Sequence, residues 1–196
     1  MSKMLDRRVQ RTHQLLREAL FALIRESGFE ALSVQDIIDR ANVGRATFYS
    51  HFENKEDLLM SGFDALRASL RERQREALSG EADLDERVFA FSHDMLVHVD
   101  EHRQLFRAMA GKRSGAAVQN VLRKLVLDLV RADMAALLAQ STARPAVTEP
   151  AVEFIAGGLF GMLLWWLGGK AKVSVEEVNA SFRRFAIPAA QAALRA

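Results

Sequence analysis

Residues 33–59 read SVQDIIDRANVGRATFYSHFENKEDLL, and this stretch decides the fold class. The Ser33 hydroxyl can accept a hydrogen bond from an amide in the first turn of a helix, and Asp36 completes an acidic variant of the capping box. A helix is therefore expected to begin near Val34. The stretch as a whole predicts two short helices joined by a tight turn, followed by the start of a third helix.

The tight turn is predicted at residues 41–44, Ala-Asn-Val-Gly. Asn42 tolerates a left-handed backbone conformation, and Gly44 carries no side chain that would strain the turn. We expect Val43 to be buried, which would pin the turn onto the core. The second helix should begin near Arg45.

The second helix has an apolar side and a polar side. Phe48 and Phe52 are four residues apart, so both should face inward. The remaining side chains lie on the flanks and the outer face: Arg45, Ala46, Thr47, Tyr49, Ser50 and His51. Residues of these types bind phosphates and read base edges, so the pattern predicts a helix-turn-helix that binds double-stranded DNA.

Residues 9–59 resemble the N-terminal domain of the tetracycline-repressor (TetR) family of bacterial transcription regulators. The matching motifs are Gly28-Phe29, Leu32-Ser33-Val34, Ile37-Ile38, Ala41-x-Val43, Thr47-Phe48-Tyr49-x-His51-Phe52 and Asn54-Lys55-Glu56-x-Leu58-Leu59. Two positions depart from the family pattern. Gly44 stands where a serine commonly caps the recognition helix, so it offers no hydroxyl to a phosphate, and Ala46 stands where a glycine is frequent.

The resemblance implies an all-α protein of about nine helices. It implies a helix-turn-helix DNA-binding domain over residues 1–53 and a helical effector-binding and dimerisation domain over residues 54–196. A looser resemblance lies in His98-x-x-Glu101-His102-x-x-Leu105-Phe106-Arg107, which looks like a signature of one TetR subgroup. The chain is identified as a member of a family of homodimeric regulators, usually repressors, and neither an enzyme nor a cofactor is expected.

The DNA-binding residues are expected to divide into base readers and phosphate binders. Arg45 can donate two hydrogen bonds to a guanine edge, although a phosphate contact is an equal alternative. The resemblance assigns Thr47, Tyr49, His51 and Lys55 mainly to phosphates. Ser33 and Gln35 begin the preceding helix, whose positive dipole end also favours a phosphate.

Composition limits the classes of function. The chain has 196 residues, 49% of them hydrophobic, and no cysteine, so a disulfide framework and a thiolate metal site are excluded. The net charge is only +2, but five basic residues and one acid lie within the first 17 positions. This local excess of +4 is either a solvated, frayed terminus or a phosphate contact. The N-terminus lacks an apolar run, which argues against a secretory signal, and we expect a cytoplasmic protein.

Apolar spacing predicts helices along the rest of the chain. The predicted ranges are 7–27, ended by Gly28; 55–78; one capped by Asp83 or Asp85 that carries Val88 and Phe89; one around Leu105 to Met109, stopped by Gly111; 115–139; 151–168; and 174 or 175–195. We expect Pro145 and Pro150 to flank a loop. Pro188 should bend or interrupt the last helix.

The apolar segment 154–169 is expected to form an interface between subunits. It is short for a membrane span, which needs roughly 20 apolar residues, so no membrane is expected as a partner. In the family the last two helices pair with their copies in a twin subunit. The predicted interface residues are Phe154, Gly157, Gly158, Phe160, Gly161, Leu163, Phe182 and Phe185. A monomer with a fully internal last helix is the alternative.

An effector cavity is expected in the C-terminal domain. Its predicted lining is rich in aromatic and methionine side chains, with a histidine as polar anchor: Phe89, His93, Met95, His98, Phe106, Met109, Met134 and Trp166. Plain core packing is the alternative for each of them. His98 and His102 have the spacing of a metal pair, but without a thiolate or an HExxH motif we expect no metal site.

Three hypotheses of function follow. The first is a ligand-responsive repressor that acts as a homodimer on a near-palindromic operator and senses a small hydrophobic effector. The second is a DNA-bound structural or cell-division protein of the same fold without an effector. The third is an enzyme or carrier that uses the cavity, and the sequence shows no catalytic motif in its favour.

Overall fold

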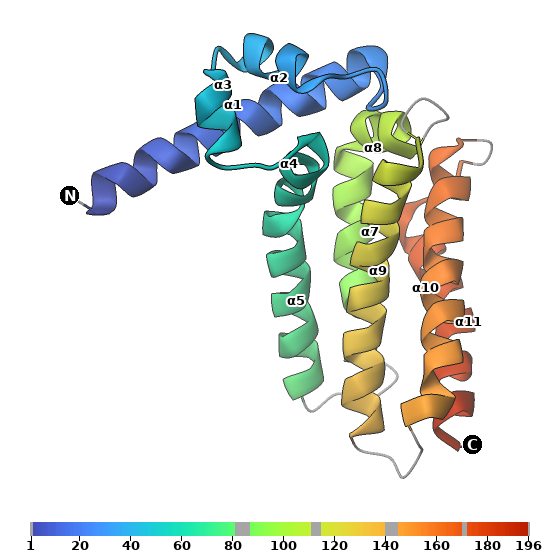
Figure 1. The fold of residues 1–196 in the computed structure, drawn as a ribbon. Coiled ribbons are helices and arrows are strands. Elements are labelled where there is room, and N and C mark those ends of the chain that lie inside the picture. Colours follow the sequence, from blue (N-terminus) through green and yellow to red (C-terminus); the bar gives the residue numbers. More distant parts are fainter. Residues whose placement is uncertain (1, 81–86, 111–114, 140–144, 170–171, 196) are drawn as a thin grey trace. The chain divides into compact units, whose positions relative to one another are not determined.

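The computed structural model is built from α-helices (Figure 1). It describes residues 2–80, 87–110, 115–139, 145–169 and 172–195. No strand occurs in these ranges, which confirms the predicted all-α class. The chain forms two compact units, Met1–Asp64 with Gln104–Gln119 and Ala65–Arg103 with Asn120–Ala196. The predicted domain boundary after residue 53 stays a prediction.

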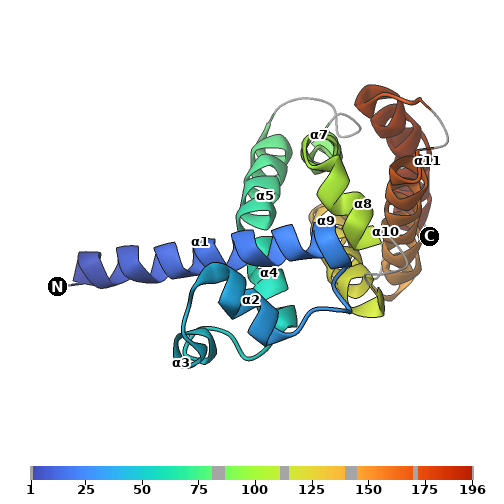
Figure 2. The same cartoon turned by 90° about the horizontal axis from the view of Figure 1, so that it is seen from above.

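The first unit is a small helical domain. Its helices are α1 (Ser2–Ser27), α2 (Val34–Ala41), α3 (Arg45–Tyr49), α4 (Lys55–Gly62) and most of α8 (Arg103–Ala110). Figure 2 shows α2 and α3 beside the long α1. The centre is filled by side chains that are fully buried: Leu16, Leu20, Phe29, Ile37, Phe48, Leu58 and Leu59. Gly28, at a φ of 80°, ends α1 as predicted.

The second unit is a helical bundle. Its helices are α5 (Asp64–Ser79), α7 (Phe91–Glu101), most of α9 (Gly115–Leu138), α10 (Pro145–Leu167) and α11 (Val175–Arg195), which lie side by side in Figure 1. The Ser174 hydroxyl accepts from the Glu177 amide at 3.2 Å, and Glu177 accepts from the Ser174 amide at 2.8 Å. This capping box fixes the start of α11 where the sequence predicts it.

The predicted helix 55–78 is divided into α4 and α5. Gly62 ends α4 against the Phe21 ring, and a Cβ at this position would lie only 2.5 Å from the ring carbon Cζ. Phe63 is the C-cap residue of α4 and is buried against Phe106, with 6.3 Å between the ring centroids. The prediction of one continuous helix over residues 55–78 was wrong, because the packing of these aromatic rings outweighs helix propensity.

The start of α7 also differs from the prediction. Phe89, expected inside a helix, has a left-handed φ of 57°, and α7 begins only at Phe91. The Phe89 amide donates to the buried carboxylate of Asp133 at 2.8 Å, which holds the turn in this conformation. The proposed caps Asp83 and Asp85, and the stop residue Gly111, lie outside the described residues.

The prolines do not break the last two helices. We expected a loop between Pro145 and Pro150, but α10 begins at Pro145 and contains Pro150. The first amides of a helix have no intrahelical acceptor, so a proline at the first position costs no hydrogen bond. Pro188 lies inside α11 without interrupting it.

Candidate nucleic-acid interface

The start of α2 is fixed by the predicted capping box. The Ser33 hydroxyl accepts from the Asp36 amide at 3.2 Å, while the Ser33 amide donates to the Asp36 carboxylate at 2.8 Å. The hydroxyl also donates to that carboxylate at 2.6 Å. These bonds to Ser33 lower the pKa of the Asp36 carboxyl. A contact of Ser33 with phosphate stays a prediction, and in the free protein its hydroxyl serves the helix.

The turn between α2 and α3 forms at the predicted residues. Asn42 is left-handed at a φ of 51°, and its amide donates to the carbonyls of Asp39 and Ile38. Val43 is half-buried, so the expectation that it would be buried was wrong. Gly44 is the N-cap of α3 in an extended conformation, without a side-chain cap. A Cβ there would meet only the Thr47 hydroxyl oxygen, at 3.8 Å, so a serine would fit.

The recognition helix α3 presents the predicted residues to solvent. Phe48 is fully buried and Phe52 is 4% exposed, which makes both of them core residues, as expected. The exposed residues are Arg45, Ala46, Thr47, Tyr49 and Ser50. The Ser50 hydroxyl donates to the Thr47 carbonyl at 2.8 Å. The helix is short, however, and Phe52 lies beyond its last residue, Tyr49.

Side chains from α2 and α3 converge on one exposed cluster. Arg45 Nη1 donates to Gln35 Oε1 at 3.2 Å, and Gln35 Nε2 donates to Asp39 Oδ1 at 2.8 Å. The Arg45 guanidinium carbon also lies 5.4 Å from the centre of the Tyr49 ring. These contacts restrain a planar guanidinium beside a phenol and an amide at the solvent surface. Such an arrangement offers donors to base edges and phosphates together.

His51 is half-buried and contacts a histidine that the sequence analysis did not select. The ring centroids of His51 and His13 are 4.9 Å apart, and those of His13 and Phe52 are 4.7 Å apart. Burial, followed by the charges of His51 and Arg17, lowers the pKa of His13. His13 Nε2 is buried without a hydrogen-bond partner among the described residues. His13 is 38 positions before His51, so no local sequence pattern could predict that the two rings are in contact.

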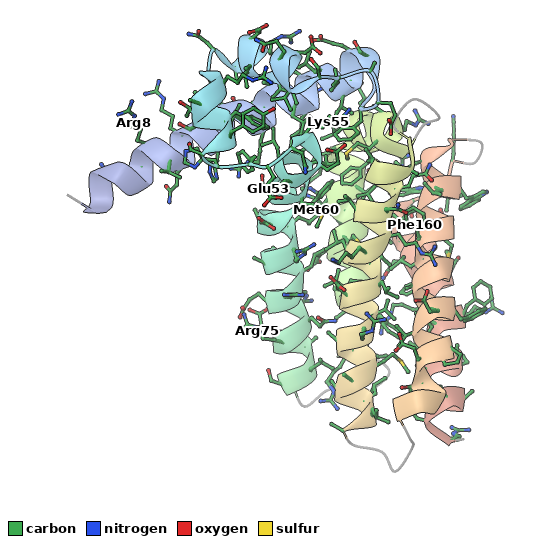
Figure 3. All side chains as sticks on the ribbon, in the orientation of Figure 1. Arg8, Glu53, Lys55, Met60, Arg75 and Phe160 are labelled. Atoms are coloured by element: carbon green, nitrogen blue, oxygen red, sulfur yellow. The ribbon has the colours of Figure 1, made fainter. Side chains whose placement is uncertain are left out.

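Lys55 has partners within the domain. Its ammonium donates to the carbonyls of Leu32 at 2.8 Å and Phe29 at 3.1 Å, and it lies 4.6 Å from the centre of the Phe29 ring. Figure 3 shows Lys55 at the start of α4, beneath the segment that joins α1 to α2. Lys55 therefore ties α4 to the loop that positions α2. The third ammonium hydrogen is the one left for the predicted phosphate contact.

The basic residues of the N-terminal region lie on the helix α1. Arg7, Arg8 and Arg11 are exposed on α1, and Arg17 is half-buried. Figure 3 shows Arg8 projecting away from the helix into solvent. The side chain of Lys3 lies outside the described residues. Their exposure leaves Arg7, Arg8 and Arg11 accessible to phosphates, and the phosphate contact itself stays a prediction.

The predicted effector residues are distributed over both units. Phe89, Met95, Met134 and Trp166 are buried in the second unit, whereas Phe106 and Met109 are buried in the first. His93 and His98 are partly exposed, His93 next to Asp94 with 3.4 Å between Nδ1 and Oδ1. Trp166 Nε1 donates to the Val173 carbonyl at 2.8 Å, and the Arg103 guanidinium lies 4.1 Å from the ring centre. Trp166 therefore has contacts within the protein itself, with Val173 and Arg103. The effector cavity stays a prediction.

The predicted interface residues lie on α10 and α11 and differ in exposure. Phe154 and Phe185 are 66% and 65% exposed, whereas Phe182 and Leu163 belong to the protomer core. The glycines 157, 158 and 161 are exposed, and Phe160 on α10 is half-buried (Figure 3). A groove of about 260 Å³ lies between the helices, lined by Phe154, Ile155, Gly158, Met162, Phe182, Phe185 and Ala186. Trp165, which we did not assign to this face, is 51% exposed.

One helix in the described part of the chain has the length and hydropathy of a membrane span. It covers Thr148–Leu167, with a mean hydropathy of 1.5. Core helices of soluble proteins pass the same test, and 39% of this segment is buried inside the protein. It exposes two aromatic side chains, Phe154 of the predicted interface and Trp165.

Comparison with known families identifies the chain. Residues 16–61 match the family of bacterial regulatory proteins described as the tetR family, and residues 86–187 match a transcriptional regulator C-terminal region. The second match alone covers more than half of the chain. The protein belongs to the TetR family of transcriptional regulators, whose fold and DNA-binding domain it has. The subgroup suggested by the residues His98 to Arg107 stays a prediction.

Individual proteins are similar to this chain in sequence or in fold. Over 60 residues the chain is 40% identical to the HTH-type transcriptional regulator YxbF of Bacillus subtilis, a stretch that covers 30% of this chain and 16% of that protein. The similarity in fold extends over most of the chain. A TetR regulator from Streptococcus agalactiae has a TM-score of 0.66 at 22% identity, over 95% of this chain and 99% of its own. A TetR-family protein from Syntrophomonas wolfei has a TM-score of 0.71 at 21% identity, over 93% and 96% of the two chains.

Proposed function

We propose that the protein is a homodimeric repressor in the cytoplasm that binds a near-palindromic operator and releases it when a small hydrophobic effector binds. The observation that carries the DNA-binding part is the exposed cluster of Gln35, Arg45 and Tyr49 on two helices of a helix-turn-helix. The exposed apolar face on α10 and α11 supports the dimer. Family membership supports the response to an effector.

The cluster suggests how DNA would be bound. Arg45 would exchange its hydrogen bond to Gln35 for two bonds to a guanine edge, and Tyr49, whose ring lies beside the guanidinium, would donate to a phosphate. In a dimer the two recognition helices would enter successive major grooves, about 34 Å apart. An effector that prefers a dimer with a different spacing would lower operator affinity by shifting the population of states.

Arg45→Ala should lower operator affinity and flatten base preference. Loss of a bidentate contact with guanine costs roughly 1 to 3 kcal/mol of discrimination, whereas contacts with phosphate act on every sequence alike. The measurement is fluorescence anisotropy with the operator found by genomic footprinting, with single-base variants of it, and with random DNA. Arg71→Ala on α5, an exposed arginine of the second unit, serves as the matched control. Equal losses on all three kinds of DNA would identify Arg45 as a phosphate contact.

Lys55→Ala should destabilise the DNA-binding domain and weaken binding to all sequences. The substitution removes two charge-assisted hydrogen bonds to the carbonyls of Phe29 and Leu32, and bonds of this kind are worth roughly 1.5 to 3 kcal/mol each. Half-burial of Lys55 places the expected loss at the lower end. The measurement is thermal unfolding together with the salt dependence of DNA binding, with exposed Lys124→Ala as control. Unchanged stability with a salt slope shallower by about one unit would instead indicate a direct phosphate contact.

A further inference from the structure

Three potential metal ligands meet at the C-terminal end of α7. His98 and Glu101 lie in its last turn, and His102 is its C-cap residue. Spacings of three and four residues place side chains on the same face of a helix. Their ligand atoms, one from each residue, all lie within 4.8 Å of one another. Among the described residues this is the one group of three such side chains.

The backbone beneath the group is fixed, while the side chains reach solvent. The His102 amide donates to the His98 carbonyl at 3.2 Å, which closes the last turn of the helix. The two imidazole rings are already in contact, with centroids 4.6 Å apart at an angle of 65°. His98 is half-buried, and Glu101 and His102 are exposed. An ion can therefore reach the group directly, and small changes of rotamer in the two exposed side chains can bring the donors together.

The donor set selects a class of ion. Zn²⁺ binds imidazole nitrogen at about 2.0 to 2.1 Å, and two histidines with one glutamate form a known zinc ligand set. The donors must then approach to roughly 3 to 3.5 Å, a modest contraction from the observed spread. Hard ions such as Mg²⁺ and Ca²⁺ prefer sites made of oxygen ligands alone, whereas two of the three donors here are imidazole nitrogens.

We propose that His98, Glu101 and His102 bind a Zn²⁺-like divalent transition-metal ion, with water in the remaining coordination positions. The proposal replaces the expectation of no metal site, which rested on the missing thiolates and the missing HExxH motif. It is independent of the proposed DNA-binding function. The ion would fasten the last turn of α7 to its C-cap residue.

The test uses the full chain without a histidine tag, freed of metal by a chelator. Titration with Co²⁺ is followed by its d–d absorption, and titration with Zn²⁺ by calorimetry. One ion per chain is expected. The variants His102→Gln and Glu101→Gln change exposed side chains and should fold as the wild type does. His93→Gln removes a partly exposed histidine of the same helix outside the group and is the matched control.

Each variant has a defined expectation. Removing His102 or Glu101 should weaken Zn²⁺ and Co²⁺ binding at least tenfold, because even residues behind the ligands contribute factors of 10 to 100. His93→Gln should bind as the wild type does. Excess Zn²⁺ should raise the melting temperature of the wild type and of His93→Gln but not of His102→Gln. Equal affinity of the wild type and His102→Gln, or no binding to the wild type, would overturn the proposal.

Discussion

The free energy of unfolding of the wild type should fall by roughly 3 kcal/mol between pH 5 and pH 8, and Asp133→Asn should abolish this fall. Asp133 is fully buried on α9, and burial raises the pKa of its carboxyl to about 7. The Phe89 amide, Gln74 and Arg183 act in the opposite direction without offsetting burial. One carboxylate oxygen accepts from Phe89, and the other has no hydrogen-bond partner among the described residues.

The sign follows from proton binding in the two states. In the unfolded chain the Asp133 carboxyl has an ordinary pKa, near 4, so it has lost its proton by pH 5. The folded protein keeps that proton up to about pH 7. Between these values the folded state binds one more proton than the unfolded state, so the free energy of unfolding falls as pH rises. Each pH unit contributes about 1.4 kcal/mol, and above the folded pKa the loss is complete.

Asparagine is suited to this position because it stays neutral and keeps an acceptor for the Phe89 amide. That acceptor matters, since the left-handed conformation of Phe89 is strained by roughly 1 to 3 kcal/mol. Neighbouring bonds support the same turn: the Ser92 hydroxyl donates to the Phe89 carbonyl at 2.7 Å, and Arg183 donates to the Val88 carbonyl at 2.6 Å. The substitution therefore removes the titration and leaves the turn in place.

The measurement is urea unfolding at pH 5, 6, 7 and 8. The difference between wild type and Asp133→Asn isolates this carboxyl, because contributions of the other groups cancel. Asp128→Asn, on the same helix but only half-buried, is the control and should follow the wild-type curve. Parallel curves for wild type and Asp133→Asn would contradict the assignment of the titration to Asp133.

Local signals in the sequence were sufficient for the helix-turn-helix of α2 and α3. Ser33 with Asp36, left-handed Asn42 and the buried pair Phe48 and Phe52 each depend on residues within four positions of one another. Capping and helical spacing act over that range, so they can be recognised from the sequence. The family resemblance then added roles for Tyr49 that spacing alone does not give.

Contacts between distant residues explain what the sequence did not predict. Phe89 was placed inside a helix because its left-handed turn depends on Asp133, 44 positions away. The division between α4 and α5 depends on Gly62 meeting Phe21. Lys55 was assigned to phosphate alone because its bonds to Phe29 and Leu32 span more than 20 residues. Tertiary packing overrides local preference at each of these points.

The second large effect is expected at the subunit interface. Positions 154, 158, 161 and 165 follow spacings of four, three and four, so they share one face of α10. Phe154 and Trp165 on this helix and Phe185 on α11 are all more than half exposed. Exposed aromatic side chains gathered around a groove are typical of a surface that is buried on association. We expect a dimer through this face, with the exposed glycines allowing close approach of the paired helices.

Gly161→Leu should convert the dimer to a monomer without harming the protomer. A Cβ added at Gly161 meets no atom within 4 Å, so a leucine fits the isolated chain. In the dimer each copy would separate closely packed backbones, and overpacking costs roughly 1 to 3 kcal/mol per site. Two symmetric copies give about 2 to 6 kcal/mol, which raises the dimer dissociation constant about thirtyfold or more.

Sedimentation velocity over a range of concentrations measures this change, and circular dichroism checks the fold. Ala68→Leu adds a leucine at an exposed position of α5 and should leave the dimer intact. Phe185→Asp tests the same face by placing a charge where an apolar contact is expected, and it should also yield a monomer. Because a monomer presents one recognition helix instead of two, both variants should lose affinity for a palindromic operator more than for a half-site. A dimer undisturbed by either substitution would place the interface on other helices.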